Sequence, residues 1–184
     1  MTLTAPKRTF TVEEYLALTQ NHAVFSPDER LELIQGEIFI MTPAGSPHAS
    51  AVTKLSVGFA RRYGDRAVVW SQNPLKLSGS MPEPDVALLK LSADVYDSSY
   101  PVAEDALLLV EVSQTSLAYD RGIKLPLYAS HLIPEVWIVN LEQRQLEVYR
   151  EPRPGTYKTS FVLTFEEPLS PLAFPNEAEA WLSR

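Results

Sequence analysis

The sequence contains no cysteine, only seven glycines against fifteen prolines, and no long apolar segment. The absence of cysteine excludes disulfides and thiolate metal sites, so any metal would be held by oxygen or by histidine nitrogen. No apolar run approaches the roughly 18 residues of a membrane span. The start, MTLTAPKRTFTVEEY, lacks the apolar core of a secretory signal. We therefore expect a soluble, cytoplasmic protein without a membrane partner.

Positive charge is also scarce, because 16 Lys and Arg face 23 Asp and Glu and leave a net charge of −7. This balance disfavours a protein that coats nucleic acid non-specifically, but it is compatible with an enzyme that has a basic cleft in an acidic exterior. Apolar residues are plentiful, at 45% of the chain. A chain of 184 residues with this composition is expected to fold as one globular domain, residues 1–184.

The first third of the chain carries clear start and turn signals. Thr11-Val12-Glu13-Glu14 fits a capping box and predicts a short helix through Leu18. LELIQGEIFIM predicts a β-hairpin that turns at Gln35-Gly36. Ser46-Pro47 predicts an N-cap and the first residue of a helix that runs to about Tyr63.

The remainder predicts more strands and two more helices. The strand candidates are AVVWS, PLKLS, EPDVALLK, ALLLVEVS, EVWIVN, QLEVYRE and YKTSFVLTF. EVWIVN and QLEVYRE are expected to pair as a hairpin. One helix should lie within residues 117–130, and NEAEAWL predicts a terminal helix. This order favours a mixed α and β fold around one sheet.

Glu111 is unexpected in its surroundings. The segment ALLLVEVS is typical of a strand buried on both faces. Burying a lone carboxylate costs several kcal/mol unless something pairs with it. Either Glu111 has a partner, or its side chain reaches a hydrated cleft, or the segment is not a buried strand.

A second carboxylate offers an explanation. Asp85 lies in the strand candidate EPDVALLK. If that strand and the one holding Glu111 are neighbours, both carboxylates can reach one edge of the sheet. Facing carboxylates repel, so one must be protonated or a divalent cation must lie between them. Mg²⁺ suits this arrangement, because it prefers oxygen ligands and binds through one or two carboxylates while keeping waters.

A lysine follows at helical spacing. Asp120, Lys124 and Tyr128 share one face of a helix. From that face the Lys124 ammonium could reach the same edge and offset charge on a phosphate. Pro126 should kink or shorten this helix.

Together and in order, several segments resemble the Uma-type restriction endonucleases of the PD-(D/E)xK nuclease superfamily. They are ELIQGEIFIMTP, PHAS, PEPDVALL, VEVSQTS and YDRGIKLPLYA with PEVWIVN, and they span about residues 11–149. The resemblance implies a restriction-endonuclease-like core, a mixed sheet flanked by helices with an added N-terminal hairpin. It also implies an endonuclease that hydrolyses DNA with Mg²⁺, or with Mn²⁺ as a substitute.

The resemblance also implies roles for individual residues. Asp85 matches the aspartate of the PD motif and Glu111 the acidic residue of (D/E)xK, so both would hold the metal, helped by the backbone carbonyl of Val112. The motif lysine falls at Ser113, and its role would pass to Lys124 in the following helix.

Further matches lie nearer the N-terminus. Glu32 and Glu37 match the EL..GE hairpin of the family, and His48 matches the histidine at the start of its core helix. Glu32 or His48 would hold a second metal or an outer-shell water. Cleavage of both DNA strands favours a homo-oligomer, in particular a dimer.

Structural interpretations stand beside each of these roles. Asp85 could be a strand-entry residue, Glu111 a partner in a buried ion pair, and Lys124 a solvated helix residue paired with Asp120. Glu32 could face solvent from its strand, and His48 could lie on the surface. Two rival functions follow: a non-catalytic nucleic-acid-binding or regulatory module that retains the nuclease fold, and a structural protein in which Glu111 pairs with Lys124 and no metal binds.

Overall fold

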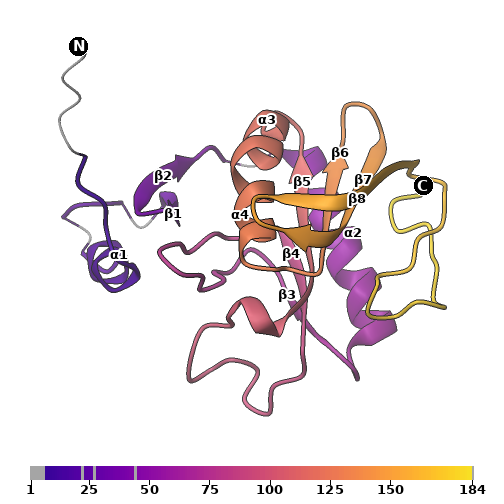
Figure 1. Cartoon of the computed structure of the whole chain (residues 1–184), viewed down its shortest axis with the longest axis horizontal. Coiled ribbons are helices and arrows are strands. Elements are labelled where there is room, and N and C mark those ends of the chain that lie inside the picture. The colour runs from indigo at the N-terminus through magenta and orange to yellow at the C-terminus, as the bar shows by residue number, and fades with distance from the viewer. Residues whose placement is uncertain (1–6, 22, 27, 44, 184) are drawn as a thin grey trace.

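The structure is a computed structural model that describes residues 7–21, 23–26, 28–43 and 45–183. Its centre is a six-stranded sheet in the order β3-β4-β5-β6-β7-β8, and a separate two-stranded sheet, β1-β2, lies to one side (Figure 1). The strands of the large sheet are β3 (Val68–Trp70), β4 (Val86–Leu89), β5 (Ala106–Ser113), β6 (Glu135–Asn140), β7 (Gln145–Arg153) and β8 (Thr156–Thr164).

The large sheet is mixed, as the resemblance to the Uma-type family implies. β5 and β6 run parallel, whereas every other neighbouring pair in the sheet is antiparallel. β4 pairs with β5 through Val86 opposite Val110, so the start of β4 lies beside the end of β5. The strand that holds Glu111 is therefore central and buried on both faces.

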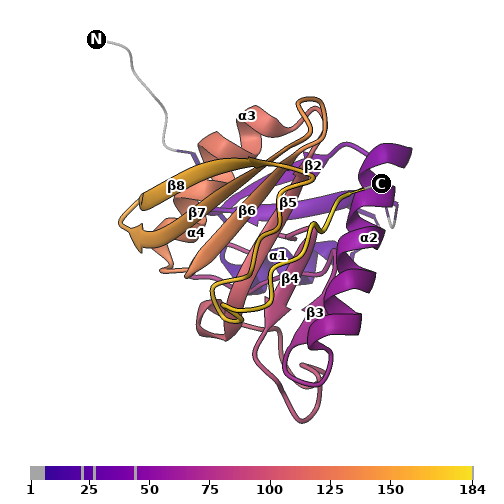
Figure 2. The ribbon, with the colours of Figure 1, turned by 90° about the vertical axis from the view of Figure 1, so that its right-hand side faces the viewer.

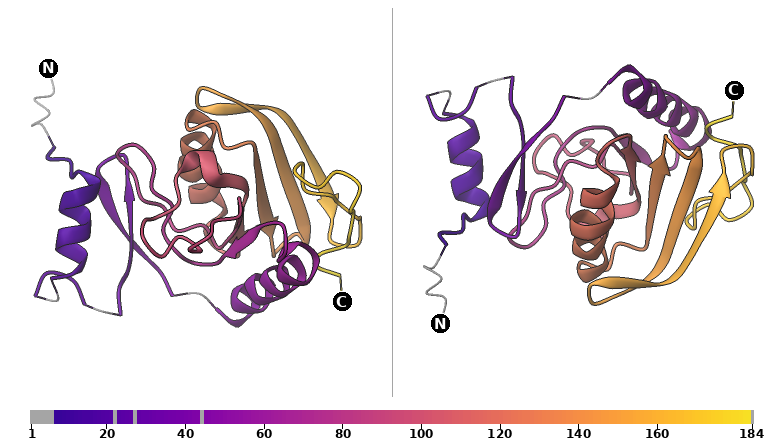
Figure 3. Two further views of the ribbon diagram at one scale, coloured as in Figure 1. Left: turned by 90° about the horizontal axis from the view of Figure 1, so that it is seen from below. Right: turned by 90° about the horizontal axis from the view of Figure 1, so that it is seen from above.

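Helices cover both faces of this sheet (Figures 2 and 3). One face packs against α2 (Ser46–Tyr63), whose Leu55 and Phe59 join a core with Val110 and Trp137. The other face packs against α4 (Leu125–Ser130), whose buried residues are Leu127, Tyr128 and Ala129. Alternate residues of β5 consequently face opposite layers.

The helix expected within residues 117–130 is divided into segments. It comprises α3 (Leu117–Tyr119), a π-helical turn η2 (Asp120–Lys124) and α4, which carries Pro126 in its first turn. Tyr119, Lys124 and Leu125 all have helical dihedral angles, and the Leu125 N–H donates to the Asp120 carbonyl, so the backbone stays helical through all three segments. The π turn directly precedes Pro126, which has no N–H to donate, and the helix continues past it to Ser130, so the predicted shortening at Pro126 is wrong.

The N-terminal segment forms a small layered unit at one end of the molecule (Figure 3). α1 (Val12–Thr19) packs on the hairpin of β1 (Arg30–Ile34) and β2 (Glu37–Met41), and the predicted capping box is present. The Tyr15 hydroxyl donates to the carbonyl of Leu31 at 2.8 Å. A bridge between Leu33 and Met81 joins the hairpin to the main body.

Gly36 closes this hairpin in a conformation that side chains disfavour, with φ +80°. A Cβ at Gly36 would lie 2.6 Å from the Thr9 Cβ, whereas one at Gly155, φ +73°, would meet nothing within 4 Å. We expect Gly155→Ala to cost about 1 kcal/mol of folding free energy for the backbone alone. Gly36→Ala should cost about 2–3 kcal/mol, because the segment at Thr9 must also move. Urea unfolding measures both variants, and equal costs would contradict the close contact at Gly36.

Three sequence predictions are wrong in detail. NEAEAWL forms no helix, because Leu169 and Glu179 pair as a bridge and Trp181 packs edge-on to Phe59, with ring centroids 4.8 Å apart. PLKLS forms isolated bridges in place of a strand, since the chain turns back between Leu77 and Ser80. The α2 N-cap is Gly45 in place of Ser46. In the first two cases tertiary pairing outweighs local propensity.

No helix in the described ranges is both long enough and apolar enough to cross a membrane.

Candidate metal and phosphate site

A cavity of about 270 Å³ opens where β4 begins and β5 ends. Asp85 immediately precedes β4, and Glu111 and Val112 lie near the end of β5. The antiparallel register brings these residues together, as the sequence predicts. Residues from the hairpin, from the start of α2 and from η2 complete the lining.

Asp85 is held in an ionised state by its neighbours. Its Oδ2 accepts the Val112 N–H at 2.8 Å and lies 3.0 Å from His48 Nε2. Burial acts to raise the pKa of Asp85, but the contact with His48, the charge of Lys124 and the Val112 N–H together lower it below its usual value. Its other oxygen, Oδ1, accepts a longer contact of 3.5 Å from the Gln72 amide, so Asp85 is an anion that is anchored mainly through Oδ2.

Glu111 is 2% exposed and has partners on both oxygens. The Tyr128 hydroxyl donates to Oε1 at 2.5 Å, and Lys124 Nζ donates to Oε2 at 3.1 Å. Burial raises the pKa of Glu111 well above its usual value, the charges of Asp120 and Asp85 add to the rise, and Lys124 opposes it. The carboxylate is thus buried, paired and beside a cavity, which accounts for its presence in an apolar strand.

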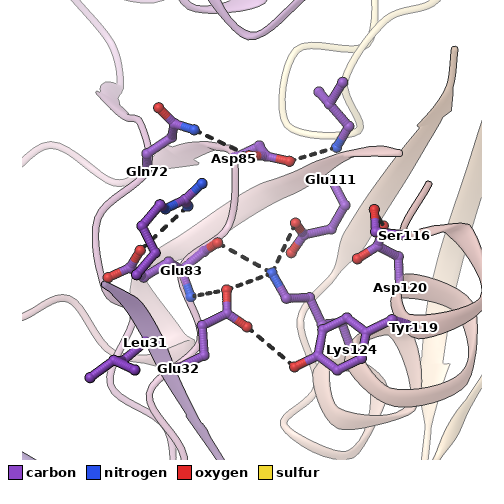
Figure 4. A network of polar contacts seen from close by, with 12 residues as sticks. Leu31, Glu32, Gln72, Glu83, Asp85, Glu111, Ser116, Tyr119, Asp120 and Lys124 are labelled. Carbon is purple, nitrogen blue, oxygen red and sulfur yellow. Dashed lines mark hydrogen bonds and ion pairs between the residues drawn. The ribbon is translucent and has the colours of Figure 1, made fainter. Parts of the chain in front are cut away.

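Lys124 occupies the centre of this network (Figure 4). Its Nζ lies 2.9 Å from Glu32 Oε1 and 3.1 Å from Glu111 Oε2, and it donates to the carbonyl of Glu83 at 3.3 Å. Burial alone would lower the pKa of Lys124, but the surrounding carboxylates, Glu111 first, raise it well above its usual value. Lys124 is therefore charged and buried, so the solvated interpretation is wrong.

Ser113, at the position of the motif lysine, binds Asp120. The hydroxyls of Ser113 and Ser116 donate to Asp120 Oδ2 at 2.6 Å and 2.7 Å. Asp120 is 4% exposed and lines the cavity. Where the family motif has a lysine, this chain thus has a neutral serine that adds no positive charge to the site.

His48 lies in the site and not on an open surface. Its side chain is 12% exposed. Among the described residues its Nδ1 is buried and has no hydrogen-bond partner. Because Nε2 faces Asp85, the ring fixes the position of that carboxylate.

All six residues to which the sequence analysis gave a role in the site line this one cavity. They are Glu32, His48, Asp85, Glu111, Val112 and Lys124. Glu37 does not, because it lies at the far end of β2, half-exposed, and pairs with Lys7 at 3.2 Å. The solvent-facing interpretation of Glu32 is wrong, since its side chain is 1% exposed.

Among the charged residues of the cavity lining, sequence reasoning missed Arg30 and Glu83. Each precedes a predicted site residue by two positions, Arg30 before Glu32 and Glu83 before Asp85. Residues two apart on an extended segment point to the same side. This spacing of two residues is the signal in the sequence that could have identified Arg30 and Glu83.

The donor set fits a hard divalent cation. The charged carboxylates around Lys124 exceed its single positive charge, and Mg²⁺ binds through one or two carboxylates and keeps waters. On a strand the N–H and C=O of one residue point the same way, so the Val112 carbonyl faces the side of Asp85. Among the described residues no three His, Asp or Glu side chains form a metal cage, so solvent or substrate would have to complete the coordination.

Comparisons with known proteins agree with this architecture. The family described as "Uma2: Putative restriction endonuclease" matches residues 12–183. A solved structure from Anabaena variabilis ATCC 29413, described as a putative nuclease belonging to DUF820, superposes with a TM-score of 0.65 at 15% identity and covers 89% of each chain. No curated protein matches the sequence. The predicted fold, a mixed sheet flanked by helices, is confirmed by this likeness.

Proposed function

Because the chain belongs to the Uma2 family of putative restriction endonucleases, we propose that it is a cytoplasmic, Mg²⁺-dependent endonuclease that hydrolyses DNA phosphodiester bonds. The observation that carries the proposal is that Asp85 and Glu111 both line one cavity where β4 begins and β5 ends, and that this cavity has more carboxylate than cationic side chains. A structural ion pair would need one carboxylate for Lys124. Here Glu32 already supplies one at 2.9 Å.

Asp85, Glu111 and the Val112 carbonyl would hold the ion, with Mn²⁺ as a substitute. The ion supplies Lewis acidity, which makes water a better nucleophile and offsets charge on the phosphate. Glu32 or His48 would hold a second ion or an outer-shell water. Hydrolysis forms a bond from the water oxygen to phosphorus, breaks the bond to the leaving oxygen and leaves a proton on that oxygen.

Contacts within the chain fix the positions of these proposed metal ligands before substrate binds. His48 and the Val112 N–H orient Asp85 through Oδ2. Tyr128 and Lys124 orient Glu111 from the opposite layer. Ligands that are held by such outer contacts need little rearrangement, which favours binding of the ion. Two sites in one assembly can cleave both strands in a single encounter, so a homodimer is the assembly that this activity favours.

The direct test is incubation with plasmid DNA in Mg²⁺ or Mn²⁺ and in EDTA. We expect cleavage with either ion and complete loss with EDTA, restored by adding excess Mg²⁺. Linear duplex, single-stranded DNA and RNA of matched length identify the preferred substrate. Full activity in EDTA would exclude the proposed mechanism.

The alternative is a nucleic-acid-binding or regulatory module that keeps the fold without catalysis. Ser113 favours it, because its hydroxyl binds Asp120 where the motif has a lysine. Such a module would bind DNA but leave it intact under every metal condition of the same assay.

A further inference from the structure

A lysine or arginine binds a phosphodiester best when it has free hydrogen-bond donors, because the phosphodiester presents a negative charge and several acceptor oxygens. Lys124 and Arg30 are the lysine and arginine side chains that line the cavity within the described part of the chain. Their surroundings differ sharply.

Lys124 has no donor to spare. An ammonium group has three N–H donors, and the acceptors around Nζ are Glu32 Oε1, Glu111 Oε2 and the Glu83 carbonyl. With 3% of its side chain exposed, it could reach a phosphate only by leaving a buried carboxylate. Lys124 therefore acts as an internal counter-ion.

Arg30 is in the opposite situation. Its guanidinium has five N–H donors, and the polar contact found for it in the described part of the chain is one long approach, Nη2 to Glu83 Oε2 at 3.5 Å. That distance is beyond the usual range of a strong hydrogen bond. The side chain is 34% exposed, so it meets both the cavity and solvent.

The backbone aims Arg30 at the site. It begins β1, two residues before Glu32, so both side chains leave the strand on the same side. Met41, its partner across the hairpin, also lines the cavity. The hairpin therefore presents a half-buried guanidinium beside the proposed metal ligands.

We propose that Arg30 binds a phosphate of the nucleic-acid substrate at this cavity, through its unused guanidinium donors, and that Lys124 does not. The proposal rests on the proposed nuclease function and assigns the substrate contact within it. A planar guanidinium matches two phosphate oxygens at once, which an ammonium cannot do. Glu83 keeps the side chain near the cavity until the phosphate takes its place.

The test compares Arg30→Gln, Arg30→Lys and Arg61→Gln. Arg61 is an exposed arginine in the last turn of α2, about 20 Å along the helix from His48, so its loss changes the net charge equally. Affinity for a short DNA duplex is measured in EDTA over a range of salt concentrations, and kcat and KM are measured in Mg²⁺.

We expect Arg30→Gln to weaken duplex binding about ten- to a hundredfold and to lower the salt slope by about one. Arg61→Gln should change neither, and Arg30→Lys should keep the salt slope but recover only part of the affinity. The rise in Tm with Mn²⁺ should survive in Arg30→Gln, which a general loss of structure would not allow.

The experiment distinguishes the failure of the Arg30 proposal from the failure of the nuclease proposal. If the wild type binds and cleaves DNA while Arg30→Gln behaves like Arg61→Gln, the phosphate role of Arg30 is overturned and the nuclease function stands. If the wild type neither binds nor cleaves nucleic acid with Mg²⁺ or Mn²⁺, both proposals fall. Should Arg30→Gln melt early, Arg30→Lys decides the matter, because wild-type affinity in that variant would exclude bidentate binding.

Discussion

Replacing Asp85 with asparagine is expected to lower the rate of DNA cleavage by at least about a hundredfold, since losing even an outer-shell contact of a metal site costs about 10–100-fold. The amide oxygen can still accept the Val112 N–H that Asp85 accepts at 2.8 Å, so the fold should survive. What disappears is the negative charge that the proposed cation requires. Single-turnover cleavage in saturating Mg²⁺ measures the loss, and far-UV circular dichroism confirms the fold.

Metal binding by itself provides a second readout of Asp85→Asn. At a Mn²⁺ concentration of 100 times Kd, the wild type should gain about 2.7 kcal/mol in stability, and the variant should gain almost nothing. Retention of both activity and metal-induced stabilisation in the variant would remove Asp85 from the site.

Glu111→Gln is the matched control for the ion-pair interpretation. Without metal it should be at least as stable as the wild type, because glutamine removes one charge from a carboxylate-rich cavity and Lys124 keeps Glu32 at 2.9 Å. It should also lose the response to Mn²⁺. A variant that melts early, together with a wild type that ignores metal, would establish Glu111 as a structural partner of Lys124.

Lys124→Met is expected to destabilise the fold by about 3–5 kcal/mol near neutral pH, because it leaves buried carboxylates without their counter-ion. Glu32 and Glu111 are 1% and 2% exposed, so water replaces the lost contacts only in part. Lys158→Met is the control, since Lys158 pairs with Glu151 at the surface, where both side chains are 56% exposed. It should change stability by less than about 1 kcal/mol. Urea unfolding measures both variants.

The cost of Lys124→Met should depend on pH. The pKa of Glu111 in the folded protein is already raised by burial above its ordinary value of 4.5, and losing the nearby ammonium raises it further. A carboxyl whose pKa is higher in the folded state contributes stability that is present below the unfolded pKa and lost as pH rises through the folded pKa. The penalty should therefore be smaller at about pH 5 than at about pH 8. A penalty that grows on acidification would contradict a buried carboxylate left unpaired.

Local rules predicted most elements of the chain, because their signals are short-range. The capping box at Thr11, the turn at Gln35-Gly36 and the apolar run around Glu111 each act over a few residues, and the structure contains the corresponding helix, hairpin and strand. The helix predicted for the terminal segment is wrong because the conformation there depends on a long-range contact. That contact is the packing of Trp181 against α2, which local sequence does not encode.

The sequence by itself determined which candidate residues share a strand end or a helix face, and the pairing of β4 with β5 met the condition under which they come together. Strand alternation and the antiparallel neighbours β4 and β5 bring Asp85 to Glu111, and helical spacing after β5 brings Lys124 and Tyr128 to the same carboxylate. These relations follow from the periods of strands and helices, which are properties of the backbone.

Only the tertiary structure decided which charged side chains of the site pair with one another. Whether Lys124 is free or engaged depends on Glu32 and the Glu83 carbonyl, which reach it from a hairpin and a loop distant in sequence. The same packing leaves Arg30 with a single long contact. The burial and the partners of a side chain depend on neighbours from several elements. The pKa of Glu111, and whether Lys124 or Arg30 has free hydrogen-bond donors, are therefore set only when these elements pack together.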